Sequence, residues 1–346
     1  MRLRQISIEG TKVGFADAFT GHYRSSRMLA RFLELAGADV VRSGATTPAM
    51  LEAGTTLASA DFCVPLRVYV GHVHRLIAEH PDMGYLLAPN VLSEDGASST
   101  CAKYRDVGGV AIRSIAGTVN YIAGRGFPRV LSPDIWRLGP LEARNACYDV
   151  YADICGWPGA ARARLAWPRC ALRDRFWPEL AQVEECARQA YEEATACDPE
   201  PLARMGAHAE RPRLAVVGRE YLARDATVSC DLVRWFARRG VSVITADDVP
   251  RSELRLDEAE GYYDTHRELG AFTRWAAQNG MDGAIVIGSF GCHPDAFQTD
   301  HFVNIAQRLG MPAWPIRFDE NSAHTGFHTR YETMLAFLEH RRDLRL

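Results

Sequence analysis

The stretch GAIVIGSFGCHPDAF, at residues 283–297, decides the fold that the sequence predicts. Its first six residues form an apolar run, which is typical of a strand buried on both faces of a parallel sheet. Gly288 and Gly291 permit a tight backbone turn, and a helical pattern is predicted near 298–309. Cys292 therefore follows the carboxyl end of a strand, which is where open α/β sheets bind ligands.

The same alternation of strands and helices extends outward from this stretch in both directions. In the second half, strands are predicted at 213–218, 241–245 and 312–316, and helices near 226–239, 263–279 and 326–342. In the first half, strands are predicted at 12–15, 38–41, 84–88 and 108–112, and helices at 24–36 and 65–79. Such alternation predicts an α/β protein with two doubly wound, Rossmann-like domains and parallel sheets.

The length of the chain suits two hydrophobic cores, because domains usually contain about 100–200 residues. Residues 126–205 differ from the rest, since they are rich in tryptophan and proline and show a long helical pattern without clear strands. We therefore predict an N-terminal α/β domain at 1–125, a helical connector or cap at 126–205 and a C-terminal α/β domain at 206–346.

Composition narrows the classes of function. The chain has 346 residues, 47% hydrophobic and 24% charged, with a formal net charge of −3. This balance gives no basic field for nucleic acid, and no apolar stretch approaches the roughly 18 residues of a membrane span. Neither GxGxxG nor GxxxxGK[ST] occurs, so a dinucleotide or P-loop site is not supported. We expect a cytoplasmic protein that acts on small molecules or proteins.

Three of the nine cysteines lie in loops that are predicted to border strand ends. They are Cys63 in DFCVPLRVYVGH, Cys101 in SEDGASSTCAKY and Cys292. A thiolate in a loop or at a helix N-terminus is a good metal ligand, because nearby donors and the helix dipole lower its pKa. The alternative is a buried, apolar thiol, and no compact CxxC pair is present. Spacing alone leaves the choice open.

Sequence motifs favour the interpretation of these cysteines as metal ligands. A T-T-x-x-M-x-x-x-G turn, an F-C-x-P-x-x-x-x-x-G-H segment and a G-S-F-G-C-x-P-D loop occur in this order. With them, roughly residues 12–125 and 211–340 resemble the acyl-CoA dehydratase activase-related proteins. These are similar to the 2-hydroxyacyl-CoA dehydratase and benzoyl-CoA reductase superfamily, including its double-cubane cluster members. The chain departs from the pattern at Ala102, where proline is expected, and at Ser229, where asparagine is expected.

The resemblance implies a cofactor and partners. It implies that Cys63, Cys101 and Cys292 converge between two α/β domains and hold a [4Fe–4S] cluster or an [8Fe–9S] double cubane. It also implies a separate ATP-hydrolysing activator or a ferredoxin-like electron donor, and a homodimer or heterodimer. Cys230 is an alternative fourth ligand, although its helical context favours a packing role.

Polar side chains near the cysteines are candidates for proton transfer. These are His72, His293, Glu320 and His324, and His293 stands out because it adjoins Cys292. Imidazole donates protons readily near neutral pH, although a hydrogen-bonded structural role is open for each histidine.

Three hypotheses of function follow. The first is an iron–sulfur enzyme for ATP-activated, low-potential reduction or reductive dehydration of a small molecule or acyl-CoA-like substrate. The second is a non-catalytic iron–sulfur protein that relays electrons, or stores or assembles clusters, for another enzyme. The third is a metal-free α/β binding protein that retains the scaffold.

Overall fold

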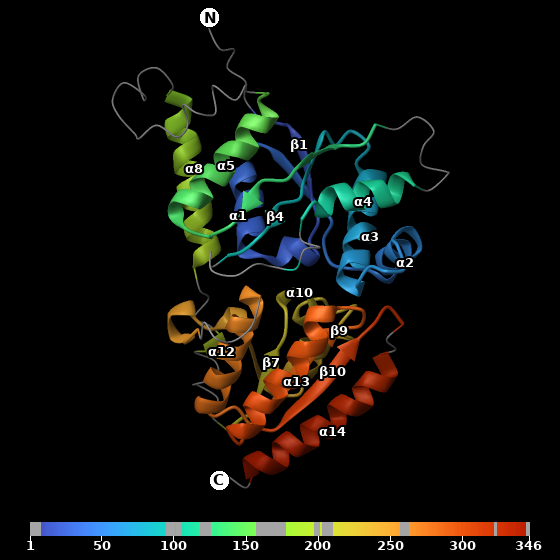
Figure 1. The fold of residues 1–346 in the computed structure, drawn as a ribbon, viewed down its shortest axis with the longest axis vertical. Helices are drawn as coiled ribbons and strands as arrows, with labels where there is room; N and C mark the ends of the chain where they lie inside the picture. Colours follow the sequence, from blue (N-terminus) through green and yellow to red (C-terminus); the bar gives the residue numbers. More distant parts are fainter. Residues whose placement is uncertain are drawn as a thin grey trace, which may run out of the picture. The chain divides into compact units, whose positions relative to one another are not determined.

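A computed structural model describes residues 8–94, 101, 105–117, 126–156, 178–196, 201–202, 210–256, 263–321 and 324–343. The chain forms two compact units (Figure 1). The first contains Met1–Gly44, Thr56–Ala58 and Tyr69–Ala196, and the second contains Ala45–Thr55, Ser59–Val68 and Cys197–Leu346. Two short segments from the N-terminal part of the chain therefore belong to the second unit. One of them carries Cys63.

The first unit is built on a four-stranded parallel sheet with the strand order β2-β1-β3-β5. The strands are β1 (Lys12–Phe15), β2 (Asp39–Arg42), β3 (Tyr85–Leu87) and β5 (Arg129–Leu131). β4 (Asn90–Val91) and β6 (Asp134–Ile135), which follow β3 and β5 in sequence, form a separate two-stranded parallel sheet. Strands were not expected within 126–205, so the sequence pattern missed β5 and β6. Both are only two or three residues long, too short to show a period.

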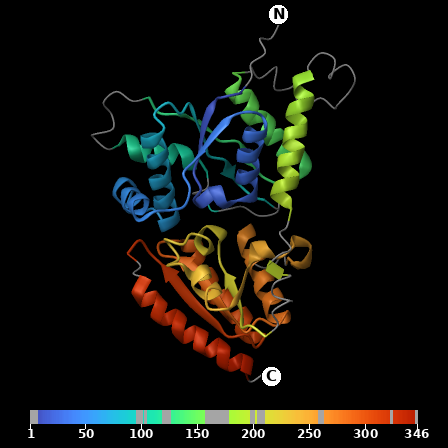
Figure 2. The same cartoon turned by 180° about the vertical axis from the view of Figure 1, so that it is seen from behind.

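Helices cover both faces of this sheet (Figures 1 and 2). One hydrophobic core joins the sheet to three helices, α1 (Arg24–Leu35), α5 (Pro140–Ile154) and α8 (Pro178–Thr195). α3 (Val64–Glu79) and α4 (Val107–Ala116) pack elsewhere on the sheet, because Leu76 contacts Gly14 of β1 and Gly108 contacts Ala88 and Val130. α2 (Pro48–Leu57) precedes α3.

The predicted strand at 108–112 is wrong, because these residues form the middle of α4. Its buried residues, Val107, Gly108, Ala111 and Ile115, follow helical spacing. Gly108 is required for packing, since a Cβ atom there would lie 2.6 Å from the Cβ atom of Ala88 and 2.7 Å from Cγ1 of Val130. The apolar GGVAI run therefore reflects a helix pressed closely against a sheet.

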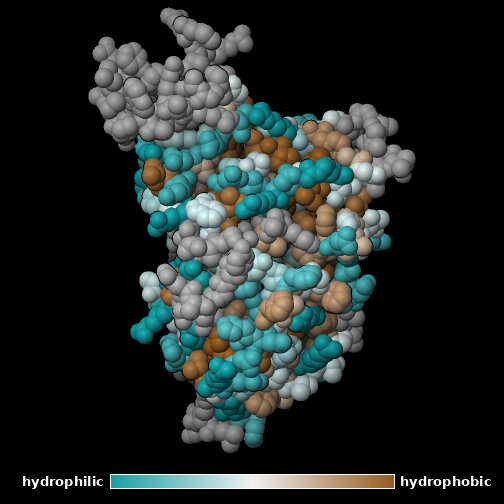
Figure 3. Space-filling model, viewed as in Figure 1, coloured by the Kyte–Doolittle hydropathy of each residue, from teal (hydrophilic) through white to brown (hydrophobic). Residues whose placement is uncertain are grey.

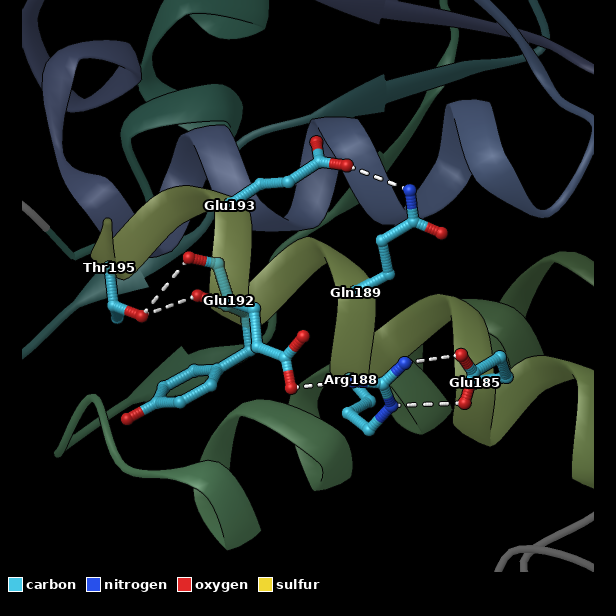
Figure 4. Close-up of polar contacts among 7 residues, drawn as sticks. Glu185, Arg188, Gln189, Glu192, Glu193 and Thr195 are labelled. Carbon is cyan, nitrogen blue, oxygen red and sulfur yellow. Dashed lines mark hydrogen bonds and ion pairs between the residues drawn. The ribbon is translucent and has the colours of Figure 1, made fainter. Parts of the chain in front are cut away.

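Charged pairs order the solvent-facing side of α8 (Figure 4). Arg188 pairs with Glu185 and Glu192, and Gln189 donates to Glu193 at 2.8 Å. Glu193 also accepts from Nε of Arg31 on α1 at 2.7 Å. Exposed pairs at this spacing stabilise a helix only weakly, so the apolar face toward α1 and α5 supplies most of the stability.

The second unit has a four-stranded parallel sheet with the order β10-β9-β7-β8. The strands are β7 (Arg213–Val217), β8 (Ser242–Thr245), β9 (Gly283–Ser289) and β10 (Ala313–Phe318). All seven residues of β9 are buried, as expected for a central strand covered on both faces. The strands predicted around the opening stretch are thus confirmed.

Two pairs of helices enclose this second sheet. α12 (Asp264–Gln278) and α13 (His293–Arg308) contact each other and share one hydrophobic core with β7, β8 and β9. α11 (Leu232–Ala237) and α14 (His324–Asp343) also contact each other, and their aromatic side chains meet where Phe236 lies 5.6 Å from Tyr331. A short helix, α10 (Glu220–Ala223), follows β7. Both units therefore have the predicted α/β architecture.

Two predicted helices have different limits. α13 begins at His293, five residues before the expected start, with Pro294 in its first turn. The helix expected at 226–239 is reduced to α11, because Cys230 and Asp231 have left-handed backbone angles, with φ values of +51° and +59°. Helical periodicity in the sequence did not reveal these two residues.

On the face shown in Figure 3, hydrophilic side chains cover much of the described surface, with apolar residues between them. Within the described ranges, no helix is both long and apolar enough to span a bilayer.

Candidate functional site

The second sheet has a topological switch point between β7 and β9. From β7 the chain continues to β8 on one side, whereas β9 pairs on the other side. Loops that leave the carboxyl ends of two such strands diverge, and the crevice between them is where open α/β sheets bind ligands. Here those loops contain Arg219, directly after β7 and Gly218, and Cys292, shortly after β9.

Cys292 and Cys63 lie near each other in this unit. Cys292 is the residue before α13, and its carbonyl oxygen accepts from the amide of Ala296 at 3.1 Å. Cys63 precedes α3 in the same manner, and its carbonyl oxygen accepts from the amides of Leu66 and Arg67. A Cβ atom built on Gly291 would lie 3.8 Å from the Cα atom of Cys63. The two cysteines are therefore neighbours in space, and each directly precedes a helix.

Gly291 is the residue that permits this approach. Its φ value of +74° lies in the left-handed region that favours glycine. A side chain at this position would strain the backbone of the loop and contact the Cys63 segment. The glycine before Cys292 therefore serves the geometry of the site.

An ion pair ties the Cys63 segment to the second unit. Nη1 of Arg67 on α3 pairs with Oε1 of Glu320, which follows β10, and Nη2 of Arg67 donates to the carbonyl oxygen of Ala60 at 2.6 Å. The Arg67 and Glu320 side chains are only 13% and 19% exposed. Glu320, a predicted proton-transfer residue, thus has a partner that positions it beside the Cys63 loop.

A second connection is made by the T-T-x-x-M turn. Oγ1 of Thr46 donates to Oδ2 of Asp225 at 2.5 Å, and Oγ1 of Thr227 donates to the carbonyl oxygen of Thr46 at 2.7 Å. The other oxygen of Asp225 accepts from the amides of Thr227 and Val228, each at 3.0 Å. Burial raises the pKa of Asp225, and these hydrogen bonds to its carboxylate oppose that rise. The motif therefore docks the segment before α2 onto the second unit.

A buried charge pair lies beneath Cys292. Nε of Arg219 donates to Oδ1 of Asp295 at 3.0 Å, and Oδ2 of Asp295 accepts from the amide of Ser289 at 2.9 Å. Burial, the Asp295 carboxylate and the Cys63 thiol together raise the pKa of the Cys292 thiol to about 12, although Arg219 opposes them. Cys292 is thus protonated in the metal-free protein, and a bound cation would favour its thiolate.

Cys230 is buried in the same unit but outside a regular helix. Burial raises the pKa of its thiol to about 11, and the carboxylate of Asp319 contributes to that rise. The preceding residue, Ser229, accepts a hydrogen bond at its carbonyl oxygen from the hydroxyl of Tyr331 at 2.9 Å. The reason for assigning Cys230 a packing role, its position inside a helix, does not hold.

The remaining predicted residues are distributed over both units. His293 is exposed in the first turn of α13, and His324 is the first residue of α14, with its side chain outside the described part. Cys101 and His72 belong to the first unit. Cys101 is half-buried, and its immediate neighbours are outside the described residues.

His72 is fully buried in α3, with Nδ1 2.7 Å from the hydroxyl of Ser43. Burial lowers its pKa to about 4, although the carboxylate of Asp17 opposes this effect. The side chain is therefore neutral at physiological pH.

The cysteine pair offers two ligand positions to a cluster. Among the described residues, no disulfide is formed, and no three His, Cys, Asp or Glu side chains gather as a metal site. Cys63 and Cys292 fit two ligand positions, because both are thiols at helix N-termini beside a glycine loop. Whether Cys101 completes the set stays a prediction.

Sequence reasoning missed four residues that shape this site. They are Thr46, Arg219, Asp225 and Asp295. Two signals were available: Arg219 directly follows the predicted strand RLAVVG, and Asp295 ends the G-S-F-G-C-x-P-D loop. A charged residue directly after a buried strand at a switch point is thus a useful marker of a ligand site in a sequence.

Residues 12–132 match the family model described as CoA enzyme activase uncharacterised domain (DUF2229). No curated protein matches the chain. The matched range includes β1, the T-T-x-x-M turn, Cys63, His72 and Cys101. The match is thus a similarity of the N-terminal part of this chain to that domain.

Proposed function

We propose that the chain holds an iron–sulfur cluster through Cys63 and Cys292, with Cys101 as a third ligand, and uses it in low-potential reduction or reductive dehydration. The observation that supports this most is the pairing of two thiols, 229 residues apart in sequence, at two helix N-termini in one compact unit. The expected substrate is a small molecule or an acyl-CoA-like compound.

The protein's own residues would shape the surroundings of such a cluster. When bound, an iron–sulfur cluster supplies one-electron chemistry at low potential. Arg219 and Asp295 would fix the loop that carries Cys292, while Arg67 and Glu320 would fix the one that carries Cys63. His293 adjoins Cys292 in sequence and is exposed. It would therefore carry protons from solvent to the neighbourhood of Cys292. ATP hydrolysis would belong to a separate activator, because the sequence lacks the GxxxxGK[ST] motif.

Metal analysis of anaerobically purified protein tests this proposal. Iron and acid-labile sulfide should be present after purification or reconstitution, with an EPR signal after reduction. Cys63→Ala and Cys292→Ala should each lose iron and colour, as should Cys101→Ala if it is a ligand. Cys186→Ala is the matched control, because this buried cysteine lies on α8 in the first unit. A wild-type protein without iron and sulfide, or equal losses in the control, would contradict the proposal.

The match to the activase domain favours a second candidate. Here the chain would bind the cluster but pass electrons to a separate acyl-CoA dehydratase, consistent with the description of the matched domain as a CoA enzyme activase domain. Titrating the reduced protein with a small acyl thioester distinguishes the two. A change in the EPR signal of the cluster supports catalysis on this chain, and reoxidation only when a dehydratase is added supports the relay.

A further inference from the structure

A polar cluster lies under the cysteine loop, on the face of the second sheet covered by α12 and α13. The Arg219–Asp295 pair forms its base, and both side chains are about 95% buried. Gly288 makes room for it, since a Cβ atom there would lie 3.1 Å from Cβ of Asp295 and 3.3 Å from Oγ1 of Thr299. This glycine lets the first turn of α13 approach the end of β9.

Gln298 follows Asp295 by three residues, so the two side chains share the buried face of α13. Gln298 is 5% exposed, and its amide nitrogen Nε2 has no hydrogen-bond partner among the described protein atoms. A buried donor without a partner is energetically unfavourable, so it is uncommon in a native structure. Among the described residues, the amide is therefore a buried donor that a bound ligand could satisfy.

His266, in the first turn of α12, presents a second such atom. Its Nε2 is also buried without a partner among the described atoms, and its ring packs 4.9 Å from the ring of Tyr263. Burial, with the charges of Arg219 and His301, lowers the pKa of His266 to about 3. The imidazole is therefore neutral and lies within electrostatic reach of Arg219.

The charges of the cluster determine what it can accept. Arg219 and Asp295 cancel each other, while Gln298 and His266 are neutral. A carboxylate or phosphate ligand would be repelled by the nearby Asp295 carboxylate. Because these four side chains carry no surplus positive charge, they would not offset the cost of removing such an anion from water. A carbonyl oxygen needs hydrogen-bond donors and no counter-charge. The cluster therefore suits a neutral carbonyl compound.

We propose that Gln298 and His266 bind the carbonyl oxygen of a neutral acyl group, such as a thioester or amide, in the crevice between the ends of β7 and β9. This inference rests on the proposed function only in treating the bound acyl group as a substrate beside Cys292. The binding itself requires no cluster and is testable on metal-free protein.

The test is an NMR titration of the metal-free protein with butyramide and with butyrate, which has the same shape but a negative charge. The Gln298 side-chain amide signals are those missing from the spectrum of Gln298→Met. Butyramide should shift them in a saturable way, butyrate should bind at least about tenfold more weakly, and inorganic phosphate should not bind.

Variants separate recognition from folding. Gln298→Met keeps the length of the side chain and removes the buried donor, so it should abolish butyramide binding and raise the urea midpoint of unfolding. His266→Phe keeps the ring beside Tyr263 and should weaken binding about tenfold. Gln307→Met, an exposed change on α13, should do neither. Equal binding by wild type and Gln298→Met, tighter binding of butyrate, or a lower midpoint for Gln298→Met would overturn the inference. None of these outcomes depends on iron content.

Discussion

Replacing Arg67 with methionine should release the Cys63 segment from the second unit. The change removes the charged partner of Glu320 and the hydrogen bond to the carbonyl oxygen of Ala60. Breaking a fully buried ion pair costs about 3–5 kcal/mol. Because both side chains are partly exposed, water would solvate the remaining carboxylate, and we expect a cost of about 2 kcal/mol. Local opening of the segment would then become about 30-fold more frequent.

Alkylation of Cys63 measures this opening directly. Peptide mass spectrometry of metal-free protein treated with iodoacetamide should show Cys63 reacting about 30-fold faster in Arg67→Met than in wild type. Arg67→Met combined with Glu320→Gln should restore part of the protection, since no charge is then left without its partner. Arg75→Met is the control, because it breaks an exposed pair with Glu79 on the same helix. Equal rates in the Arg67 and Arg75 variants would refute the assignment of Arg67 as the residue that positions this loop.

Three further outcomes are expected. Thr46→Val, which removes the hydroxyl bound to a buried carboxylate, should cost about 2 kcal/mol and also accelerate Cys63 alkylation; unchanged protection would contradict the docking role of the turn. Folding lowers the pKa of His72 to about 4, so His72 binds protons more readily in the unfolded chain, and stability should fall by about 3 kcal/mol as the pH drops from 6.5 to 4. Urea unfolding at the two pH values should show a smaller fall for His72→Gln, whereas the exposed His340→Gln should show the same fall as wild type. Gly218→Ala would place a Cβ atom 2.1 Å from a side chain of β9 and should lower stability by about 2 kcal/mol, whereas Gly126→Ala, with nothing within 4 Å, should be tolerated.

Much of the fold could be predicted because buried parallel strands appear as apolar runs. β7 and β9 were found this way, and the helix-to-strand alternation placed Cys292 after β9. The GGVAI run of α4 misled for the same reason, since its glycines mark close packing of a helix and not the end of a strand. Short apolar runs are ambiguous between the two structures.

The composition of the site was harder to predict than the fold. Arg67 and Glu320 are 253 residues apart, and Thr46 and Asp225 are 179 residues apart. No local pattern encodes such pairs, so the sequence could not show that Cys63 belongs to the same unit as Cys292. The left-handed pair at Cys230 and Asp231 was hidden for a similar reason, because tertiary contacts impose a conformation that neither residue prefers.

The presence of residues 45–55 and 59–68 in the second unit has a consequence for how this gene can be divided. A single cut, whether by gene fission, fusion or proteolysis, cannot separate the two units into intact pieces. A fragment covering only the matched range 12–132 would carry Thr46 and Arg67 without the carboxylates that they bind. A fragment that carries only one of the two cysteines would therefore expose a surface that is covered only when the fragment with the other cysteine is present.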